Sequence, residues 1–192
     1  MDQIQPFDLV VFLALLAMFI VGYAQGIMRR LLGILAMLFS LGIAAQLRAP
    51  LGNYLAQQWT LSRPEYSWMV AFGVIFLGAA IALSLGIQFS YRPAPIINRY
   101  PVLDEILGGV LGVLESLIIL AAILIIIDPY FSSFPTHPGA EFAPLRGLHD
   151  FIDNAVSAQV LRDQVIPSVF SWVGFLFPKD VIDTFAAVLI RL

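Results

Sequence analysis

The sequence predicts an all-α membrane protein, in which four transmembrane helices precede a C-terminal tail of short amphipathic and interfacial helices. Of the 192 residues, 60% are apolar and only 12% are charged, whereas soluble globular domains carry roughly 25% charged residues. Four apolar runs also approach the length of about 20 residues that a helix needs to cross the hydrocarbon core. After the fourth run, prolines and charged residues become frequent.

The same composition excludes several classes of function. A net charge of −3 with Lys179 as the single lysine offers no basic surface for nucleic acid, because such binding depends on neutralising phosphates. The absence of cysteine excludes disulfides, thiolate catalysis and Cys-ligated metals, and it leaves the redox compartment open. We therefore expect the lipid bilayer as the main partner and no nucleic acid.

The transmembrane domain is expected to cover residues 1–128. Its predicted spans are residues 9–28, 31–47, 68–89 and 106–127. The first run follows acidic residues without a Lys or Arg, and no small-residue cleavage site comes after it, so we interpret it as a permanent helix rather than a signal peptide. Only Arg29 and Arg30 separate the first two runs, which predicts a tight antiparallel hairpin with a positively charged turn.

The distribution of arginine predicts the orientation of the bundle, because Lys and Arg in short loops stay in the cytoplasm. Arg48 and Arg63 fall on one side of the predicted membrane. The larger set, expected on the cytoplasmic side, consists of Arg29, Arg30, Arg92 and Arg99. Both termini would then face the periplasm of a bacterial inner membrane.

Residues 129–192 are predicted to form an extramembrane tail that begins with a proline-rich linker. Apolar residues at helical spacing over 148–160 predict one amphipathic helix. The following apolar run, 169–177, lies between two prolines and is too short to span a bilayer, so we interpret it as interfacial or re-entrant. Its aromatic anchors are Phe170, Trp172, Phe175 and Phe177. A last short helix is expected to run from Asp180 through Arg191.

Glu115 stands near the middle of the fourth span, where an acidic side chain is costly and is usually paired or functional. Counting from the expected helix ends places Ser40 at a similar depth and no other acid or base beside it. We expect Glu115 to be protonated and to hold helices together by a hydrogen bond, with a proton or substrate role as the alternative.

Small residues recur at intervals of four on three of the spans, a spacing that lets helix backbones approach closely. They are Gly22 and Gly26 on the first, Gly78, Ala82 and Gly86 on the third, and Gly108 and Gly112 on the fourth. This pattern predicts a tight bundle or a homo-oligomer.

No pattern in the chain indicates catalysis. The two histidines, His137 and His149, are too far apart to suggest a metal site even with Glu141 between them. Neither the HExxH spacing of a zinc helix nor a GxSxG elbow occurs. We expect no metal, no cofactor and no catalytic residue, and thus a protein that is not an enzyme.

Three stretches resemble the colicin V production protein (CvpA) family. The first combines Asp8, Gly22, Gly26 and Arg29 before the second span. The second is the glycine-rich sequence LDEILGGVLG over residues 103–112, and the third is the Ile166-Pro167 pair that follows Leu161. The resemblance covers the chain from Leu9 to about Pro167. It implies a multi-pass inner-membrane protein linked to colicin V production or export and to envelope maintenance, with no established catalytic residue.

The chain departs from the family pattern at three charged positions. The family often has an acid where this chain has Arg30, a basic residue where it has Glu105, and an arginine near the position of Glu115. The resemblance therefore implies that an ion pair typical of the family is absent or reversed here.

Two functions follow from these observations. The first is a non-catalytic accessory to the production or export of a peptide toxin, with envelope or secretion proteins as partners. The second is a small oligomeric transporter or channel component in which Glu115 is linked to an ion or a proton. A membrane-embedded hydrolase lacks the necessary set of side chains.

Overall fold

The computed structural model describes residues 5–58, 64–90, 101–132 and 143–176, which are almost entirely helical and contain no strand. Three of these helices are long and apolar enough to cross a membrane. They are α1 (Pro6–Gln58), α2 (Pro64–Ser90) and α3 (Pro101–Ser132). The all-α membrane class is confirmed. Four transmembrane helices are not confirmed, because the first two predicted spans fall in the long helix α1, which bends sharply between them.

The bend of α1 lies at Gly26, whose φ of 75° and ψ of 175° interrupt the helical conformation. Only glycine adopts such a φ without a Cβ penalty, so the chain reverses here and not at the arginines. The predicted turn at Arg29 and Arg30 was therefore wrong, since both residues lie in the helix after the bend. We call residues 6–25 the first arm of α1 and residues 27–58 the second arm.

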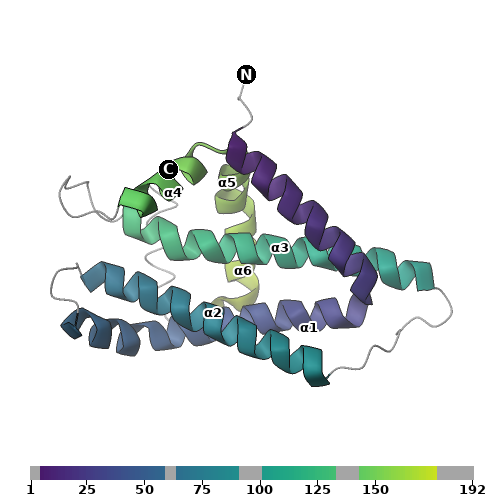
Figure 1. The fold of residues 1–192 in the computed structure, drawn as a ribbon, viewed down its shortest axis with the longest axis horizontal. Coiled ribbons are helices and arrows are strands. Elements are labelled where there is room, and N and C mark those ends of the chain that lie inside the picture. Colours follow the sequence, from purple (N-terminus) through teal and green to yellow (C-terminus); the bar gives the residue numbers. More distant parts are fainter. Residues whose placement is uncertain (1–4, 59–63, 91–100, 133–142, 177–192) are drawn as a thin grey trace.

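The second arm, α2 and α3 lie side by side (Figure 1). The first arm begins near the middle of α3 and runs obliquely to that helix until it reaches the bend. The beginning of α3 extends past the bend. Relative to α3, the first arm runs in the opposite direction and the second arm in the same direction. The bend thus places both arms of α1 against one face of α3.

The glycines of the first arm and of α3 lie against each other. A Cβ atom added at Gly22 would overlap the carbonyl oxygen of Gly108, and one at Gly112 would overlap the carbonyl oxygen of Met18. One at Gly26 would overlap the carboxylate of Asp104. The first arm and α3 therefore approach each other along backbone atoms, as small residues four apart allow.

Gly108 offers a direct test of this close approach. Its added Cβ would lie 2.6 Å from the Gly22 carbonyl oxygen and 2.8 Å from backbone atoms of Gly26. Because backbone cannot rotate out of the way, we expect Gly108→Ala to lower the free energy of unfolding by about 1–3 kcal/mol, the usual cost of overpacking. The measurement is denaturant unfolding in detergent. Gly78→Ala, where nothing lies within 4 Å of the added Cβ, is the control and should be neutral or slightly stabilising. Equal losses in both variants would contradict the packing.

The small residues of α2 behave differently. Gly78, Ala82 and Gly86 are exposed on the outer side of the helix, and an added Cβ at either glycine meets nothing within 4 Å. The glycines of this stripe therefore make no close backbone contact within the bundle. Packing against a second copy of the chain stays a prediction.

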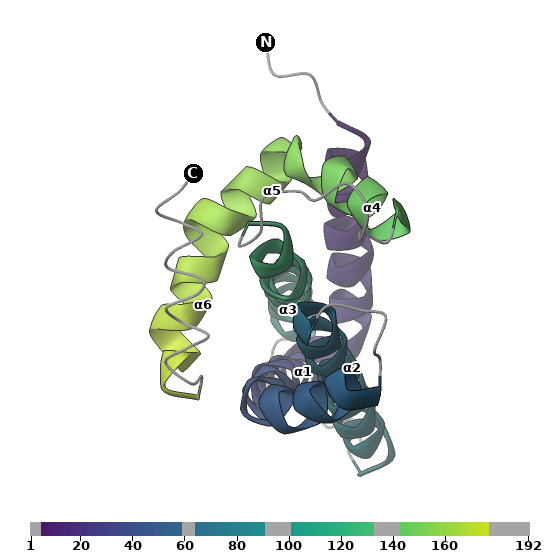
Figure 2. The same ribbon diagram turned by 90° about the vertical axis from the view of Figure 1, so that its left-hand side faces the viewer.

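The described part of the tail, residues 143–176, contains four short helical segments and one turn of π-helix. They are α4 (Ala143–Asp153), α5 (Val156–Val160), η1 (Leu161–Val165), α6 (Ile166–Val173) and η2 (Gly174–Leu176). Figure 2 shows them as an arc from the beginning of α1 to the opposite flank of the bundle. The described tail therefore packs on the transmembrane helices.

The predicted single amphipathic helix over 148–160 was wrong, because α4 ends at Asp153 and α5 begins at Val156. The break turns the chain, so the buried side chains do not form the expected face. Those buried around and after the break are Ile152, Ala155, Ala158, Leu161 and Ile166, whereas Leu148, Phe151, Val156 and Val160 are exposed.

Several predictions fall outside the described residues. They concern Arg92 and Arg99, His137 and Glu141, Phe177, and the helix from Asp180 through Arg191.

Candidate functional site

Glu115 is paired with Arg30 inside the bundle. Arg30 lies just after the bend of α1, and its Nη1 donates a hydrogen bond to Oε2 of Glu115 on α3. The two side chains are only 6% and 8% exposed. The expectation that no basic group lies at the depth of Glu115 was therefore wrong. The pair has the reversed polarity that the departures at positions 30 and 115 allow.

The expected hydrogen bond between Ser40 and Glu115 does not form. Ser40 is fully buried, but its Oγ donates to the carbonyl oxygen of Ala36 at 2.7 Å, one turn earlier in the same helix. It also lies ten residues after Arg30, which corresponds to about 15 Å along the helix. Counting from the arginines placed Ser40 at the wrong depth, because the second arm begins directly after Gly26.

A glycine makes room for the ion pair. A Cβ added at Gly33 would lie 2.7 Å from Oε1 of Glu115, so the carboxylate lies directly against the backbone of the second arm. Buried charges in an apolar bundle need partners because desolvation is costly. Arg30 meets that need with one nitrogen, while its buried Nε has no hydrogen-bond partner.

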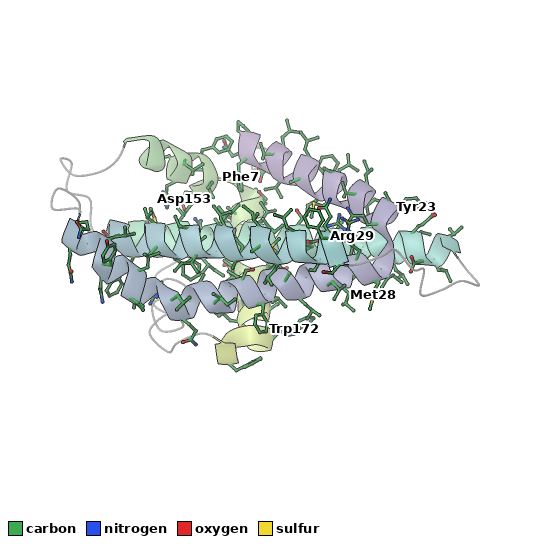
Figure 3. The ribbon with its side chains drawn as sticks, turned by 60° about the horizontal axis from the view of Figure 1, so that its bottom comes forward. Phe7, Tyr23, Met28, Arg29, Asp153 and Trp172 are labelled. Atoms are coloured by element: carbon green, nitrogen blue, oxygen red, sulfur yellow. The ribbon has the colours of Figure 1, made fainter. Side chains whose placement is uncertain are left out.

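A third charged side chain, Asp104, lies at the bend. It belongs to the first turn of α3, and its Oδ2 lies against Gly26. Asp104 is buried, and its Oδ1 has no hydrogen-bond partner. We call Gly26, Arg30, Asp104 and Glu115 the bend site. Figure 3 shows the neighbouring Tyr23, Met28 and Arg29 around the bend.

A second group of buried charges, which we call the tail clamp, joins the tail to α3. Arg162 donates from Nε and Nη2 to the two carboxylate oxygens of Asp128, at 2.8 and 2.9 Å. Its Nη1 donates to Asp153 at 2.9 Å. The hydrogen bonds from Arg162 to Asp128 hold the pKa of the guanidinium above its usual value, so Arg162 stays charged. This two-pronged geometry is the strongest form of arginine–carboxylate contact.

The beginning of α1 binds the tail as well. Oδ1 of Asp8 accepts hydrogen bonds from the backbone nitrogen and Oγ of Ser157, at 2.8 and 2.6 Å. Ser157 lies in the first turn of α5, where free backbone N–H groups need an acceptor. Beside it, the rings of Phe7 and Phe151 meet edge to face at 5.7 Å. Figure 3 shows Phe7 and Asp153 on this side of the molecule.

Sequence reasoning missed Asp104, Asp128 and Arg162. Asp128 directly follows the last predicted span, and an acid at that point is a candidate partner for a basic residue elsewhere. Arg162 is a single cation in a largely apolar stretch of the tail, which is the signal that could have found it.

The described residues contain no group of three His, Cys, Asp or Glu side chains that could hold a metal ion. His149 lies 3.9 Å from the neighbouring Asp150. What the buried groups do is pair charges: arginine neutralises a carboxylate at two places, and one carboxylate oxygen at the bend is left without a partner.

Comparison with protein families gives a match over residues 7–165 to the family described as colicin V production protein. The matched segment includes the bend site and the tail clamp. No curated protein matches the chain, and no solved structure matches it.

Proposed function

Because the chain belongs to the colicin V production protein family, we propose that it is a non-catalytic accessory to the production or export of a peptide toxin in the bacterial inner membrane. It also contributes to envelope maintenance. The observation that carries this proposal is the family match from the first arm of α1 to η1.

The side-chain chemistry supports a role without catalysis. Two of the buried carboxylates, Glu115 and Asp128, are each held by an arginine side chain, so structural contacts occupy their oxygens. Buried arginine–carboxylate pairs of this kind fix how helices meet. Such an accessory acts through its shape and its contacts, and envelope or secretion proteins are its proposed partners.

Cross-linking in intact cells tests this function. The chain has no cysteine, so single cysteines can be introduced at exposed positions, with Gln159→Cys on the tail and Gly78→Cys on α2. We expect Gln159→Cys to capture an envelope or secretion protein and Gly78→Cys to capture a second copy. The fully buried Ala44→Cys is the control. Normal colicin V export in a deletion strain, with no captured partner, would refute the accessory function.

A transporter or channel component is the second candidate, and Asp104 favours it. Transport sites often form where a membrane helix is broken. Here the break at Gly26 lies against the buried carboxylate of Asp104, whose Oδ1 has no hydrogen-bond partner. In this function the bend site, and not Glu115 alone, would bind the ion or proton. Ion-dependent flux in liposomes that is lost in Asp104→Asn, with the protein still folded, would favour transport over the accessory function.

The proposed topology places the segment between α2 and α3 in the cytoplasm and both termini in the periplasm, following the arginines of that segment. A reporter inserted after Arg99 should therefore report cytoplasm, and one fused after Leu192 should report periplasm. A reporter enzyme that is active only in the periplasm, paired with one that is active only in the cytoplasm, makes the measurement. A cytoplasmic C-terminus in a fully inserted protein would contradict this orientation.

The aromatic part of the tail is proposed to contact lipid. Trp172 and Phe175 are 73% and 83% exposed, while Phe170 is half-buried. We expect the fluorescence of Trp172 to be strongly quenched by bromine-labelled lipids, since large exposed aromatic side chains favour the membrane interface. The measurement uses a chain in which Trp59 and Trp68 are replaced by phenylalanine. Quenching no greater than that of a water-exposed tryptophan would contradict lipid contact.

A further inference from the structure

A cavity of about 270 Å³ lies where the tail crosses the transmembrane helices. Its walls come from the second arm of α1, from α3 and from the segment η1–α6. Ile34 and Leu38 line it on α1, Leu117 and Ile118 on α3, and Val169 on the tail. Figure 3 shows Trp172, another lining residue, on α6 beside α1. The docked tail therefore forms one wall of a half-open pocket on the side of the transmembrane helices.

We propose that this cavity holds one acyl chain of a bilayer phospholipid. Voids much larger than a water molecule are rare in protein interiors, and an unfilled one loses the dispersion contacts of its walls. Apolar walls favour hydrocarbon over water, as in an engineered apolar cavity of about 150 Å³ that stays dry and binds benzene. The chain is a membrane protein, so hydrocarbon is the solvent around it.

The lining also indicates which source of hydrocarbon binds. No charged side chain lines the cavity, and Gln164 and Ser168 are its polar residues. A free fatty acid would bring a carboxylate that has no cation to meet it, and burying such a charge is costly. A phospholipid inserts only its chain, because its headgroup stays at the membrane surface.

The first experiment measures the lipid that the purified full-length protein retains after exchange into a delipidating detergent. In the Leu38→Trp/Leu117→Trp variant, two lining residues, one on α1 and one on α3, are replaced by larger side chains that fill the cavity. The matched control is Leu77→Trp/Ile81→Trp, because both residues are exposed on α2 and neither lines the cavity. We expect the wild type and the control to retain about one phospholipid per chain, and the filled variant at least fivefold less. Equal retention in the two variants, or no lipid on the wild type, would overturn the proposal.

A second experiment needs no substitution and covers the case in which the filled variant does not fold. The wild type is reconstituted with a phospholipid that carries a photoactivatable group on its acyl chain, or with a fatty acid that carries the same group. After detergent exchange and illumination, we expect the phospholipid to label residues 114–118 and 164–172. Labelling of α2 alone, or labelling of the cavity by the fatty acid alone, would refute a phospholipid chain in the cavity.

Discussion

Replacing Glu115 with leucine should lower the free energy of unfolding by about 3–5 kcal/mol, the usual cost of removing one partner from a buried ion pair. The substitution leaves the guanidinium of Arg30 in the bundle without its carboxylate. Glu115→Gln should lower the free energy of unfolding by less, because its amide oxygen still accepts a hydrogen bond from Arg30. Denaturant unfolding of the three proteins in the same detergent is the measurement.

The double variant Arg30→Met/Glu115→Leu separates stability from function. Apolar residues of similar size often replace a buried ion pair without loss of stability, so the double variant should recover most of the stability that Glu115→Leu loses. If it is stable and also supports colicin V production, the pair is structural. If it is stable but inactive, the pair takes part in the function. A fully stable Glu115→Leu protein would contradict the buried pair itself.

The second large effect is expected at the tail clamp. Arg162→Met leaves the carboxylate of Asp128, of which only 4% is exposed, buried without a counter-charge. We expect a loss of about 3–5 kcal/mol, together with rapid proteolysis of the tail, because the contact from Arg162 to α3 is lost.

Asp153→Asn is the matched control for the clamp. It removes the other carboxylate bound by Arg162, but that side chain is 46% exposed, so its loss should cost less than about 1 kcal/mol. Unfolding and limited proteolysis of both variants give the comparison. Similar losses for Arg162→Met and Asp153→Asn would show that the buried contact with Asp128 does not hold the tail.

Apolar length and small-residue spacing predicted much of the fold. The glycine pairs at positions 22 and 26 and at 108 and 112 predicted close helix packing in general, because a missing Cβ permits such contact, but their spacing did not show that α1 and α3 are the partners. The same spacing on α2 carried no information about its neighbours, since an exposed stripe has the same sequence as a packed one. Long apolar runs also could not reveal that two predicted spans are arms of one bent helix.

Glu115 was identified from the sequence, but its partner was not. The two consecutive arginines were interpreted as a cytoplasmic turn, so Arg30 was treated as a marker of the membrane surface rather than as a buried side chain. The conformation of Gly26 determines whether Arg30 lies at the membrane surface or inside the bundle. Because the reversal occurs four residues earlier, Arg30 enters the bundle and reaches Glu115. Neither Asp128 nor Arg162 shows in its local sequence that the two meet, since their contact depends on the turn at Asn154 and Ala155.

The contacts of Gly26 with Asp104 and Gly108 on α3 have a consequence for the order in which parts of the chain reach their final positions. Ribosomes add about 5–20 residues per second, so α3 follows the bend by roughly 4–16 s, and Gly108 and Asp104 are missing during that time. The newly inserted α1 lacks the backbone that holds its two arms in place. The hydrogen bond of Asp8 forms later still, because its partner Ser157 is synthesised near the end of translation. The N-terminal arm is therefore synthesised first but reaches its final position among the last parts of the chain.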